Sequence, residues 1–494
     1  MDIKTGFEAA TTVFLVSSIV FLFGCTDLTR YRTGTTPQSG DCKPGDAKEL
    51  CPIVLTGPDR AYSMSVVEFD DQGDLFSKQP VDLALAQINA PQADSDKYQG
   101  MLVVAFAHGW NHNAQAGDPN LVFFDAMLAR MAAFEAAEAA SDDRKPRRVC
   151  GVFLAWRGLS QRIPGLQLLT FWNRKDTAHR IGERGATEVL IKLGNAAYSA
   201  RAQSDLHPNR YIVMGHSFGG AVVYSAMSQL IAMDFLQQQQ GQAEHKRPLL
   251  ADAVVLFNPA FEAARIQHLL ETAGTLGPRR PTLSIFTSKS DWATGLAFPI
   301  ARYFNTAALD YREADNPIKN GAGIGQRKAN VQTPGHYNAY LTHDLVKAGD
   351  NSDCPVVSKN VLPTMPALIG ASQAQKQDAG NQALDAMADL EDEYEAGRIM
   401  NFGLSCLVPR ADLKFAQLSV INVSMDDTVW HNHDLVQSDD RVAIMLDFLE
   451  KFIPFAASPK ALQEPLVAVQ AVPGFAGAHP GRSKEGRRRP RSRF

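Results

Sequence analysis

Short apolar runs alternate with helical patterns along much of the chain. Six of these runs are rich in β-branched and aromatic residues without strict polar alternation, which predicts strands buried on both faces. They lie at 101–107, 149–155, 210–215, 252–258, 282–287 and 418–424. Helical patterns lie between them, including 178–203, 219–236 and 439–453. Strand and helix in this repeated order predict the α/β class, with a doubly wound and mostly parallel sheet.

The segment from 305 to 415 breaks this alternation. It contains the Gly-rich stretch GAGIG at 321–325 and an Ala-, Glu- and Asp-rich stretch at about 371–398 that predicts a helix. GAGIG has neither the spacing nor the clear preceding strand of a dinucleotide-binding loop. We therefore interpret 305–415 as a helical insertion before the last strand, with a cap over a site as its candidate role. The core is expected at 56–304 and 416–455.

The first 25 residues predict that the protein is targeted to a membrane. Residues 9–24 form an apolar run that is short for a membrane span and typical of a signal-peptide core. The sequence LFGC at 22–25 resembles a bacterial lipobox, in which the cysteine, here Cys25, is lipidated after cleavage. An uncleaved anchor helix is the alternative. Both interpretations predict a membrane-anchored protein of the bacterial cell envelope that faces the periplasm or the outside, with 26–55 as a polar tether.

Charge narrows the choice of partners. The 494 residues have a net charge of −4, which gives no electrostatic case for nucleic-acid binding. The one strong charge asymmetry is the basic end of 456–494, which is typical of a disordered tail. The sequence does not indicate an oligomeric state.

The cysteines fit an oxidising compartment. The pairs that we expect there are Cys42–Cys51 and Cys354–Cys406. Cys150 lies inside an apolar run and is expected to be a buried free thiol. Because neither a zinc-type cluster of Cys and His nor an HExxH motif is present, we expect no catalytic metal, and we expect no cofactor.

The strongest chemical signal is the sequence GHSFGG at 215–220, between an apolar strand pattern and an apolar helix pattern. A GxSxG turn in this setting holds the serine hydroxyl above the sheet in a strained backbone conformation. Gly215 and Gly219 flank the serine because larger side chains would collide in so tight a turn. Ser217 is therefore the candidate nucleophile.

This arrangement resembles the α/β-hydrolase superfamily, particularly its bacterial serine esterases and lipases, over roughly residues 60–305 and 415–455. The resemblance implies an eight-stranded, mostly parallel sheet and acyl-transfer chemistry. In this superfamily a His-Gly-X turn after an early strand supplies one amide of the oxyanion hole. The sequence HGWNHN at 108–113 matches that turn, so the resemblance gives the N–H groups of Trp110 and Phe218 as the oxyanion donors.

The superfamily order of nucleophile, acid and base indicates where the acid should lie. Asp291 follows the strand predicted at 282–287 and is the expected acid. A buried carboxylate at this position would hold an imidazole in one tautomer and stabilise its charged form. Glu262, after the strand predicted at 252–258, is the other candidate.

The base is expected in the loop between the last strand and the closing helix. This loop contains His431 and His433, and the sequence around His433 better resembles the motif that precedes the closing helix. His336 and His343, in the predicted insertion, are further candidates.

Together these residues predict a serine hydrolase that cleaves carboxylic esters through Ser217, His433 and Asp291. Membrane attachment and nearby apolar loops favour a hydrophobic ester, including lipid, as the substrate at a membrane surface. Two alternatives remain open. One is a catalytically inactive hydrolase fold that acts as an anchored binding or structural protein, and the other is an acyltransferase that uses the same three residues.

Overall fold

The computed structural model describes most of the chain between residues 28 and 457. The parts of this range that it leaves out are 59–60, 90–96, 142, 160–166, 200–208, 241–250, 278, 307–308, 310, 312–324, 351, 358–370, 412, 414–416, 436 and 438–439. The predicted signal peptide with Cys25, most of GAGIG and the tail beyond residue 457 lie outside the described residues.

The described residues form one sheet of 12 strands, and not the eight that the resemblance implies, in the order β1-β2-β3-β5-β4-β6-β7-β8-β12-β9-β11-β10. The strands are β1 (Gln38–Ser39), β2 (Val54–Thr56), β3 (Tyr62–Glu68), β4 (Met101–Ala107), β5 (Arg148–Ala155), β6 (Arg210–His216), β7 (Ala253–Phe257), β8 (Leu283–Ser288), β9 (His343–Lys347), β10 (Met400–Asn401), β11 (Ser405–Pro409) and β12 (Val420–Met425). All neighbours from β3 to β9 in this order are parallel. The predicted fold, an α/β-hydrolase type of doubly wound and mostly parallel sheet, is confirmed.

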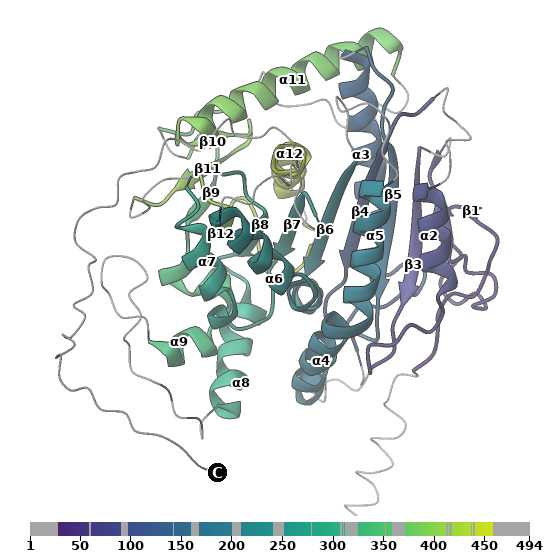
Figure 1. Ribbon diagram of the computed structural model, residues 1–494, viewed down its shortest axis with the longest axis horizontal. Coiled ribbons are helices and arrows are strands. Elements are labelled where there is room, and N and C mark those ends of the chain that lie inside the picture. Colours follow the sequence, from purple (N-terminus) through teal and green to yellow (C-terminus); the bar gives the residue numbers. More distant parts are fainter. Residues whose placement is uncertain are drawn as a thin grey trace, which may run out of the picture. The chain divides into compact units, whose positions relative to one another are not determined.

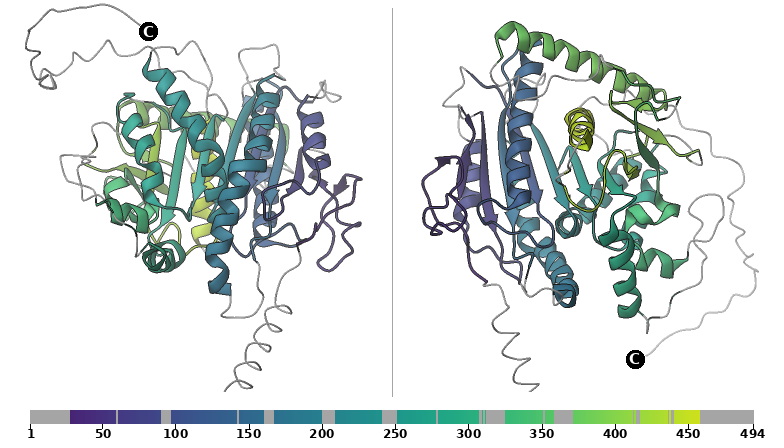
Figure 2. Two further views of the ribbon diagram at one scale, coloured as in Figure 1. Left: turned by 60° about the horizontal axis from the view of Figure 1, so that its bottom comes forward. Right: turned by 180° about the vertical axis from the view of Figure 1, so that it is seen from behind.

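Helices cover both faces of this sheet. They are α2 (Gln79–Asn89), α3 (Pro119–Ser141), α4 (Gln167–Ile181), α5 (Thr187–Ser199), α6 (Phe218–Gln239), α7 (Gln267–Ala273), α8 (Phe298–Asn305), α9 (Gln326–Val331), α11 (Gln373–Glu395) and α12 (Asp440–Ala456). Helices α2, α5, α4, α6 and α7 pack against one another, and α3, α11 and α12 form a second group. In the left view of Figure 2, the purple, blue and teal helices α2, α5 and α6 lie side by side.

Alternate residues of each strand serve the two helix layers, because successive side chains of a strand point to opposite faces. Val103 and Ala105 of β4 pack in one cluster with Val222 of α6. Phe106, the residue after Ala105, points to the opposite face and stacks on Phe124 of α3, with ring centroids 5.3 Å apart. This explains why β4 is apolar without alternation.

Helix α6 is the central helix of its layer. Among the described residues it is the one helix long and apolar enough to cross a membrane by length and composition, but 67% of its apolar window is buried inside the protein. Its apolar character on all sides is therefore that of a core helix.

The segment predicted as an insertion lengthens the sheet at one edge. Strand β9 joins β12 in parallel, and β11 and β10 follow antiparallel. Helix α11, predicted from its composition, begins with a capping box between Ser372 and Gln375. Figure 1 shows α11 running along the top of the molecule from β10 to α3. It crosses α3 closely, since a β-carbon on Gly380 would lie 2.1 Å from the carbonyl oxygen of Ala137. The described part of this segment thus contributes strands to the sheet and a helix that packs on α3.

The described residues from 28 to 55 differ from the expected tether, because they fold against the core. Arg32 is fully buried, and its guanidinium forms two hydrogen bonds to Asp41, at 2.6 and 2.7 Å. The same side chain donates to the carbonyl oxygen of Ala114 at 2.7 Å, and Glu68 of β3 accepts the backbone N–H of Arg32. A buried charge needs partners of this kind, and here they attach the segment to the sheet.

Both expected disulfides are present, between Cys42 and Cys51 and between Cys354 and Cys406. Cys150 is buried and free. The first disulfide closes the folded N-terminal segment, and the second ties the loop after β9 to β11.

Replacing each pair by alanine should destabilise the protein by different amounts, because the loops differ in length. The separations are 9 residues for Cys42–Cys51 and 52 for Cys354–Cys406. Loop-closure entropy then gives a loss of about 2.6 kcal/mol for the first pair and about 4 kcal/mol for the second. Denaturant unfolding of the two double variants measures both values. A larger loss for the shorter loop would contradict the entropic account.

Candidate active site

Ser217 lies in a sharp turn between β6 and α6. Its backbone has φ +56° and ψ −120°, a conformation that a residue with a β-carbon rarely adopts. The turn is possible because Gly219 approaches β4 closely: a β-carbon there would lie 2.0 Å from the carbonyl oxygen of Ala107. A β-carbon on Gly215 would likewise lie 2.6 Å from the carbonyl oxygen of Gly219. The strained turn predicted from GHSFGG is therefore present.

The structure brings together the three residues chosen from the sequence. His433 Nε2 lies 2.7 Å from Ser217 Oγ, and His433 Nδ1 lies 2.8 Å from Asp291 Oδ2. Ser217 and Asp291 are buried, whereas the His433 side chain keeps 16% of its surface exposed. With Nδ1–H donated to the carboxylate, Nε2 is free to accept the hydroxyl proton of Ser217. This arrangement can generate a nucleophilic oxygen without a metal.

Asp291 is held in its charged form by several donors. Its Oδ1 accepts the backbone N–H groups of Ala293 at 2.9 Å and Thr294 at 3.2 Å, and its Oδ2 also accepts the Thr294 hydroxyl. Burial alone would raise the pKa of Asp291, but the charge and hydrogen bond of His433 and the Thr294 donors lower it overall. His336 Nε2 lies 3.2 Å from Thr294 Oγ1, so this candidate base is one hydrogen bond behind the acid.

The backbone of His433 is fixed by two residues that the sequence analysis did not identify. The carbonyl oxygen of His433 accepts from His216 Nε2 at 2.8 Å and from Asn258 Nδ2 at 2.9 Å. Asn258 Oδ1 also accepts the N–H of Ser288, at the end of β8 before the acid loop. Burial lowers the pKa of His216 well below its usual value, which keeps the ring neutral. The polar residue at the end of β7 was the available sequence signal for Asn258.

The other candidate acid, Glu262, serves a different purpose. It is buried and forms ion pairs with Lys175 at 2.7 Å, Arg302 at 3.0 Å and Arg265 at 2.9 Å. Burial acts to raise the pKa of Glu262, but Lys175 and Arg302 lower it to about 2. The carboxylate is committed to these cations.

The remaining candidate bases also have other partners. His431 Nδ1 lies 3.1 Å from Ser290 Oγ, and His343 Nδ1 lies 2.9 Å from Thr342 Oγ1 in the strand region of β9. Of the histidines considered, the structure therefore brings His433 alone into hydrogen-bonding distance of the Ser217 hydroxyl.

The loop after β4 leads to the expected oxyanion donors. Phe218 is the first residue of α6, and no hydrogen bond between described residues uses its N–H or that of Trp110. The loop is held by His108, whose Nε2 accepts the N–H of Trp156 at 3.0 Å and whose Nδ1 contacts the Gly109 carbonyl oxygen at 2.9 Å. Burial lowers the pKa of His108 to about 4, so this histidine is a neutral structural group.

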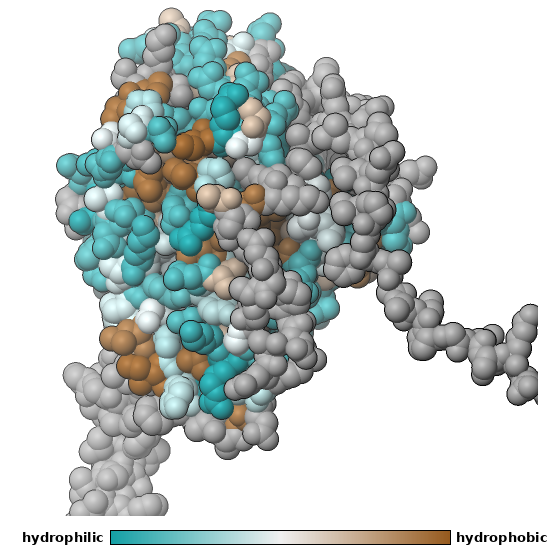
Figure 3. Space-filling view, turned by 90° about the vertical axis from the view of Figure 1, so that its left-hand side faces the viewer, coloured by the Kyte–Doolittle hydropathy of each residue, from teal (hydrophilic) through white to brown (hydrophobic). Residues whose placement is uncertain are grey.

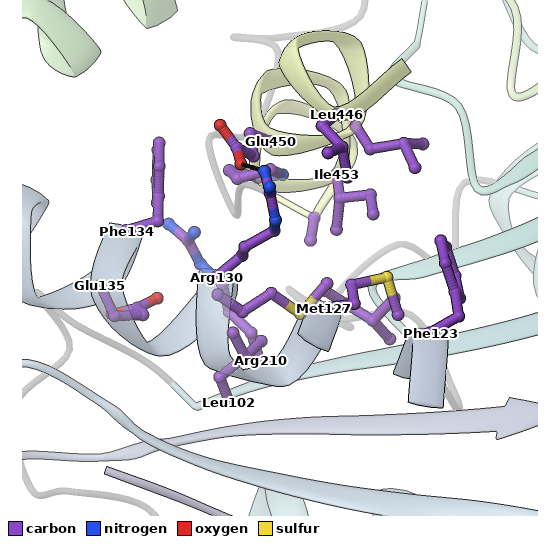
Figure 4. A pocket seen from close by; sticks show the side chains of 15 residues that line it. Leu102, Phe123, Met127, Arg130, Phe134, Glu135, Arg210, Leu446, Glu450 and Ile453 are labelled. Carbon is purple, nitrogen blue, oxygen red and sulfur yellow. Dashed lines mark hydrogen bonds and ion pairs between the residues drawn. The ribbon is translucent and has the colours of Figure 1, made fainter. Parts of the chain in front are cut away.

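The described residues offer no metal-binding cluster as an alternative site, and the apolar hollow between α3 and α12 lies elsewhere. Among the described residues, no group of three His, Cys, Asp or Glu side chains could hold a metal ion. Figure 4 shows a hollow between α3 and α12, lined by apolar side chains beside the ion pair of Arg130 with Glu450. Leu102 and Ile212 line it from the starts of β4 and β6, whereas Ser217 follows the end of β6. The two regions lie at opposite ends of the parallel strands.

Comparison with known proteins agrees with this fold. Residues 200–305 match the family described as "Alpha/beta hydrolase of unknown function (DUF900)", and this segment contains both Ser217 and Asp291. No curated protein matches the chain. The family description and the fold support a hydrolase.

Two solved structures show weak similarity. One is a thermophilic esterase from the Planctomycetes species Thermogutta terrifontis with propionate bound, at 16% identity and a TM-score of 0.16, covering 40% of this chain and 65% of the esterase. The other is the Tle1 effector bound to the VgrG spike of the Type 6 secretion system, at 12% identity and a TM-score of 0.17, covering 52% and 57%. This chain thus spans less than two thirds of either structure.

Replacement of Gly219 by alanine should destabilise the protein, because the new β-carbon would force β4 and α6 apart. We expect a loss of about 1–3 kcal/mol in the free energy of unfolding. Gly274→Ala is the matched control, since its β-carbon would meet its nearest neighbour at an ordinary 3.4 Å. Chemical denaturation compares the two variants with the parent protein. Equal midpoints for Gly219→Ala and the control would show that the turn accommodates the new β-carbon, and would contradict the predicted clash with Ala107.

Proposed function

We propose that this protein is a serine hydrolase that cleaves carboxylic esters. The observation that supports this most strongly is the continuous hydrogen-bonded chain from Ser217 through His433 to Asp291, with distances of 2.7 and 2.8 Å. A hydroxyl in this setting is activated by a neighbouring base that a buried carboxylate orients.

In the proposed reaction, the Ser217 oxygen forms a bond to the acyl carbon while His433 takes the hydroxyl proton. The negative charge that develops on the carbonyl oxygen is stabilised by the N–H groups of Trp110 and Phe218. The ester C–O bond then breaks, and His433 gives its proton to the leaving alcohol. Water attacks the acyl-enzyme by the same route in reverse, releasing the acid and restoring Ser217.

Ser217→Ala and His433→Ala should each lower kcat for p-nitrophenyl butyrate by about 10⁴-fold, because the members of such a triad act as a unit. His431→Ala is the matched control: it lies two residues away, contacts Ser290, and should retain most of the activity. Steady-state kinetics on the purified variants measures these ratios. If His431→Ala is as inactive as His433→Ala, or Ser217→Ala is fully active, the assignment is wrong.

Two rival functions share the same fold. A catalytically inactive, anchored binding protein would leave Ser217 unreactive toward a fluorophosphonate probe, whereas the proposed hydrolase labels rapidly at this residue. An acyltransferase would label as well, but the acyl group would pass to an added alcohol in preference to water. Product analysis with and without an alcohol acceptor separates these two reactions.

Membrane attachment belongs to the same proposal. The apolar run at 9–24 followed by Cys25 supports a lipid-anchored protein of the bacterial cell envelope that acts on hydrophobic esters at a membrane surface.

Cys25→Ser should abolish incorporation of radiolabelled palmitate, because the substitution removes the thiol that the lipid modifies. It should also release the protein from the membrane fraction. The measurement is labelling in a bacterial host followed by fractionation. Unlabelled wild-type protein that stays in the membrane would instead indicate the uncleaved anchor helix.

A further inference from the structure

We propose that the cavity between Trp110, Phe171 and α8 binds one unbranched, medium-length acyl chain, so that the preferred substrates are esters of such acids. This inference rests on the proposed esterase function and names its substrate class. The cavity has a volume of about 220 Å³. The described residues that line it are Trp110, Phe171, Trp292, Ala293, Ala297, Ile300 and Ala301.

The cavity adjoins the reacting groups. Trp110 carries one of the proposed oxyanion N–H groups, and Ala293 donates its own N–H to Asp291. Phe171 packs on Phe218, which carries the other oxyanion N–H, with ring centroids 4.7 Å apart. A carbonyl group held at the oxyanion donors would therefore have its acyl carbons next to this cavity.

The shape of the cavity fits a narrow chain. Ala293, Ala297 and Ala301 recur at intervals of four residues along η4 (Ala293–Ala297) and α8, so they lie along one face. Small side chains on that face leave a groove, and the aromatic rings of Trp110 and Phe171 form other parts of the wall. The described side chains that line the cavity are apolar apart from the indole N–H groups, which disfavours acyl groups that carry a charge or a sugar.

The volume sets the chain length. An apolar cavity of about 150 Å³ binds benzene, with six carbons, so about 220 Å³ holds about eight or nine carbons. The expected acyl chain is therefore of medium length.

An ion-pair cluster holds the two walls of the cavity at a fixed distance. Lys175 lies one turn after Phe171 on α4, and Arg302 directly follows Ala301 on α8. Both cations bind the same oxygen of the buried Glu262, at 2.7 and 3.0 Å. The width of the cavity is therefore set by the fold before a substrate arrives.

The outer rim of the cavity is apolar as well. Trp292 and Ile300 line the cavity and expose half of their surfaces. Figure 3, which faces the side of α8 and α9, shows a brown apolar patch at its lower end, the end at which α8 lies in Figure 1. An exposed apolar rim favours substrates that are themselves poorly soluble.

The first test is the acyl-chain profile of the full-length protein with p-nitrophenyl esters of two to sixteen carbons. We expect kcat/KM to rise from acetate to octanoate, by up to about fourfold per buried methylene, and to fall for palmitate. Ala297→Phe should lower the octanoate-to-acetate ratio by about tenfold or more, because the new ring fills the groove. Leu296→Phe adds a ring to the adjacent exposed position outside the lining and should leave the ratio unchanged.

A binding readout separates the cavity from the chemistry. Octanoate, but not acetate, should change the tryptophan fluorescence of Ser217→Ala, since Trp110 and Trp292 line the cavity, and Ala297→Phe in that background should remove the change. Ala301→Leu gives an independent, milder obstruction should Ala297→Phe fold poorly.

The outcomes distinguish the two proposals. A flat chain-length profile in a protein whose activity requires Ser217 would overturn the acyl cavity and leave the esterase. Octanoate binding that Ala297→Phe removes, in a protein without esterase activity or fluorophosphonate labelling, would overturn the esterase and leave the cavity. Equal responses of Ala297→Phe and Leu296→Phe would also overturn the cavity.

Discussion

The left-handed backbone of Ser217 is the constraint on which the rest of the site depends. A conformation of this kind is strained, and it persists only where the surroundings over-determine it. Here the Ser217 N–H bonds to the carbonyl oxygen of Phe257 at 2.9 Å, and the Ser217 carbonyl oxygen accepts from Ala260 at 3.1 Å. The end of β7 thus holds one side of the turn, while Gly219 presses against Ala107 of β4 on the other. The turn therefore requires β4, β6 and β7 to be neighbours, which the parallel order of the sheet provides.

The second constraint on the site is the pair of hydrogen bonds that the carbonyl oxygen of His433 accepts. Fixing a histidine through its ring would use the nitrogens that catalysis needs, whereas fixing it through its backbone leaves both nitrogens for Ser217 and Asp291. His216 and Asn258 do the latter, from the ends of β6 and β7. Because Asn258 also accepts from Ser288, one amide side chain aligns the acid loop with the base loop. Loops that are distant in the sequence thus share one framework.

Sequence predicted what local patterns encode. The apolar run 101–107 coincides with β4, and GHSFGG marks the turn at Ser217 because strand, tight turn and helix are adjacent in the chain. Superfamily order then indicated where the acid and the base should lie. The sequence did not predict strands β9 to β11, because these strands are short and partly polar and lie toward one edge of the sheet. The folding of the expected tether depends on the burial of Arg32 by contacts such as that with Ala114, 82 residues away, which no local pattern records. A single polar residue after an apolar strand, such as Asn258, is only a weak sequence signal, because it does not indicate which loops the side chain contacts.

The two buried carboxylates, Asp291 and Glu262, differ in how well each suits the proposed reaction. The pKa of each is lowered against the effect of burial, so both are ionised at neutral pH. Glu262 faces permanent cations, including Lys175 and Arg302, and its charge is already compensated when the reaction begins. Asp291 faces neutral donors and His433, so in the proposed reaction its charge would still be available to stabilise an imidazole that becomes positive in the transition state. Glu262 can therefore connect α4 and α8 through its ion pairs, but it would add little to catalysis. A lowered pKa alone does not distinguish such a structural carboxylate from a catalytic one.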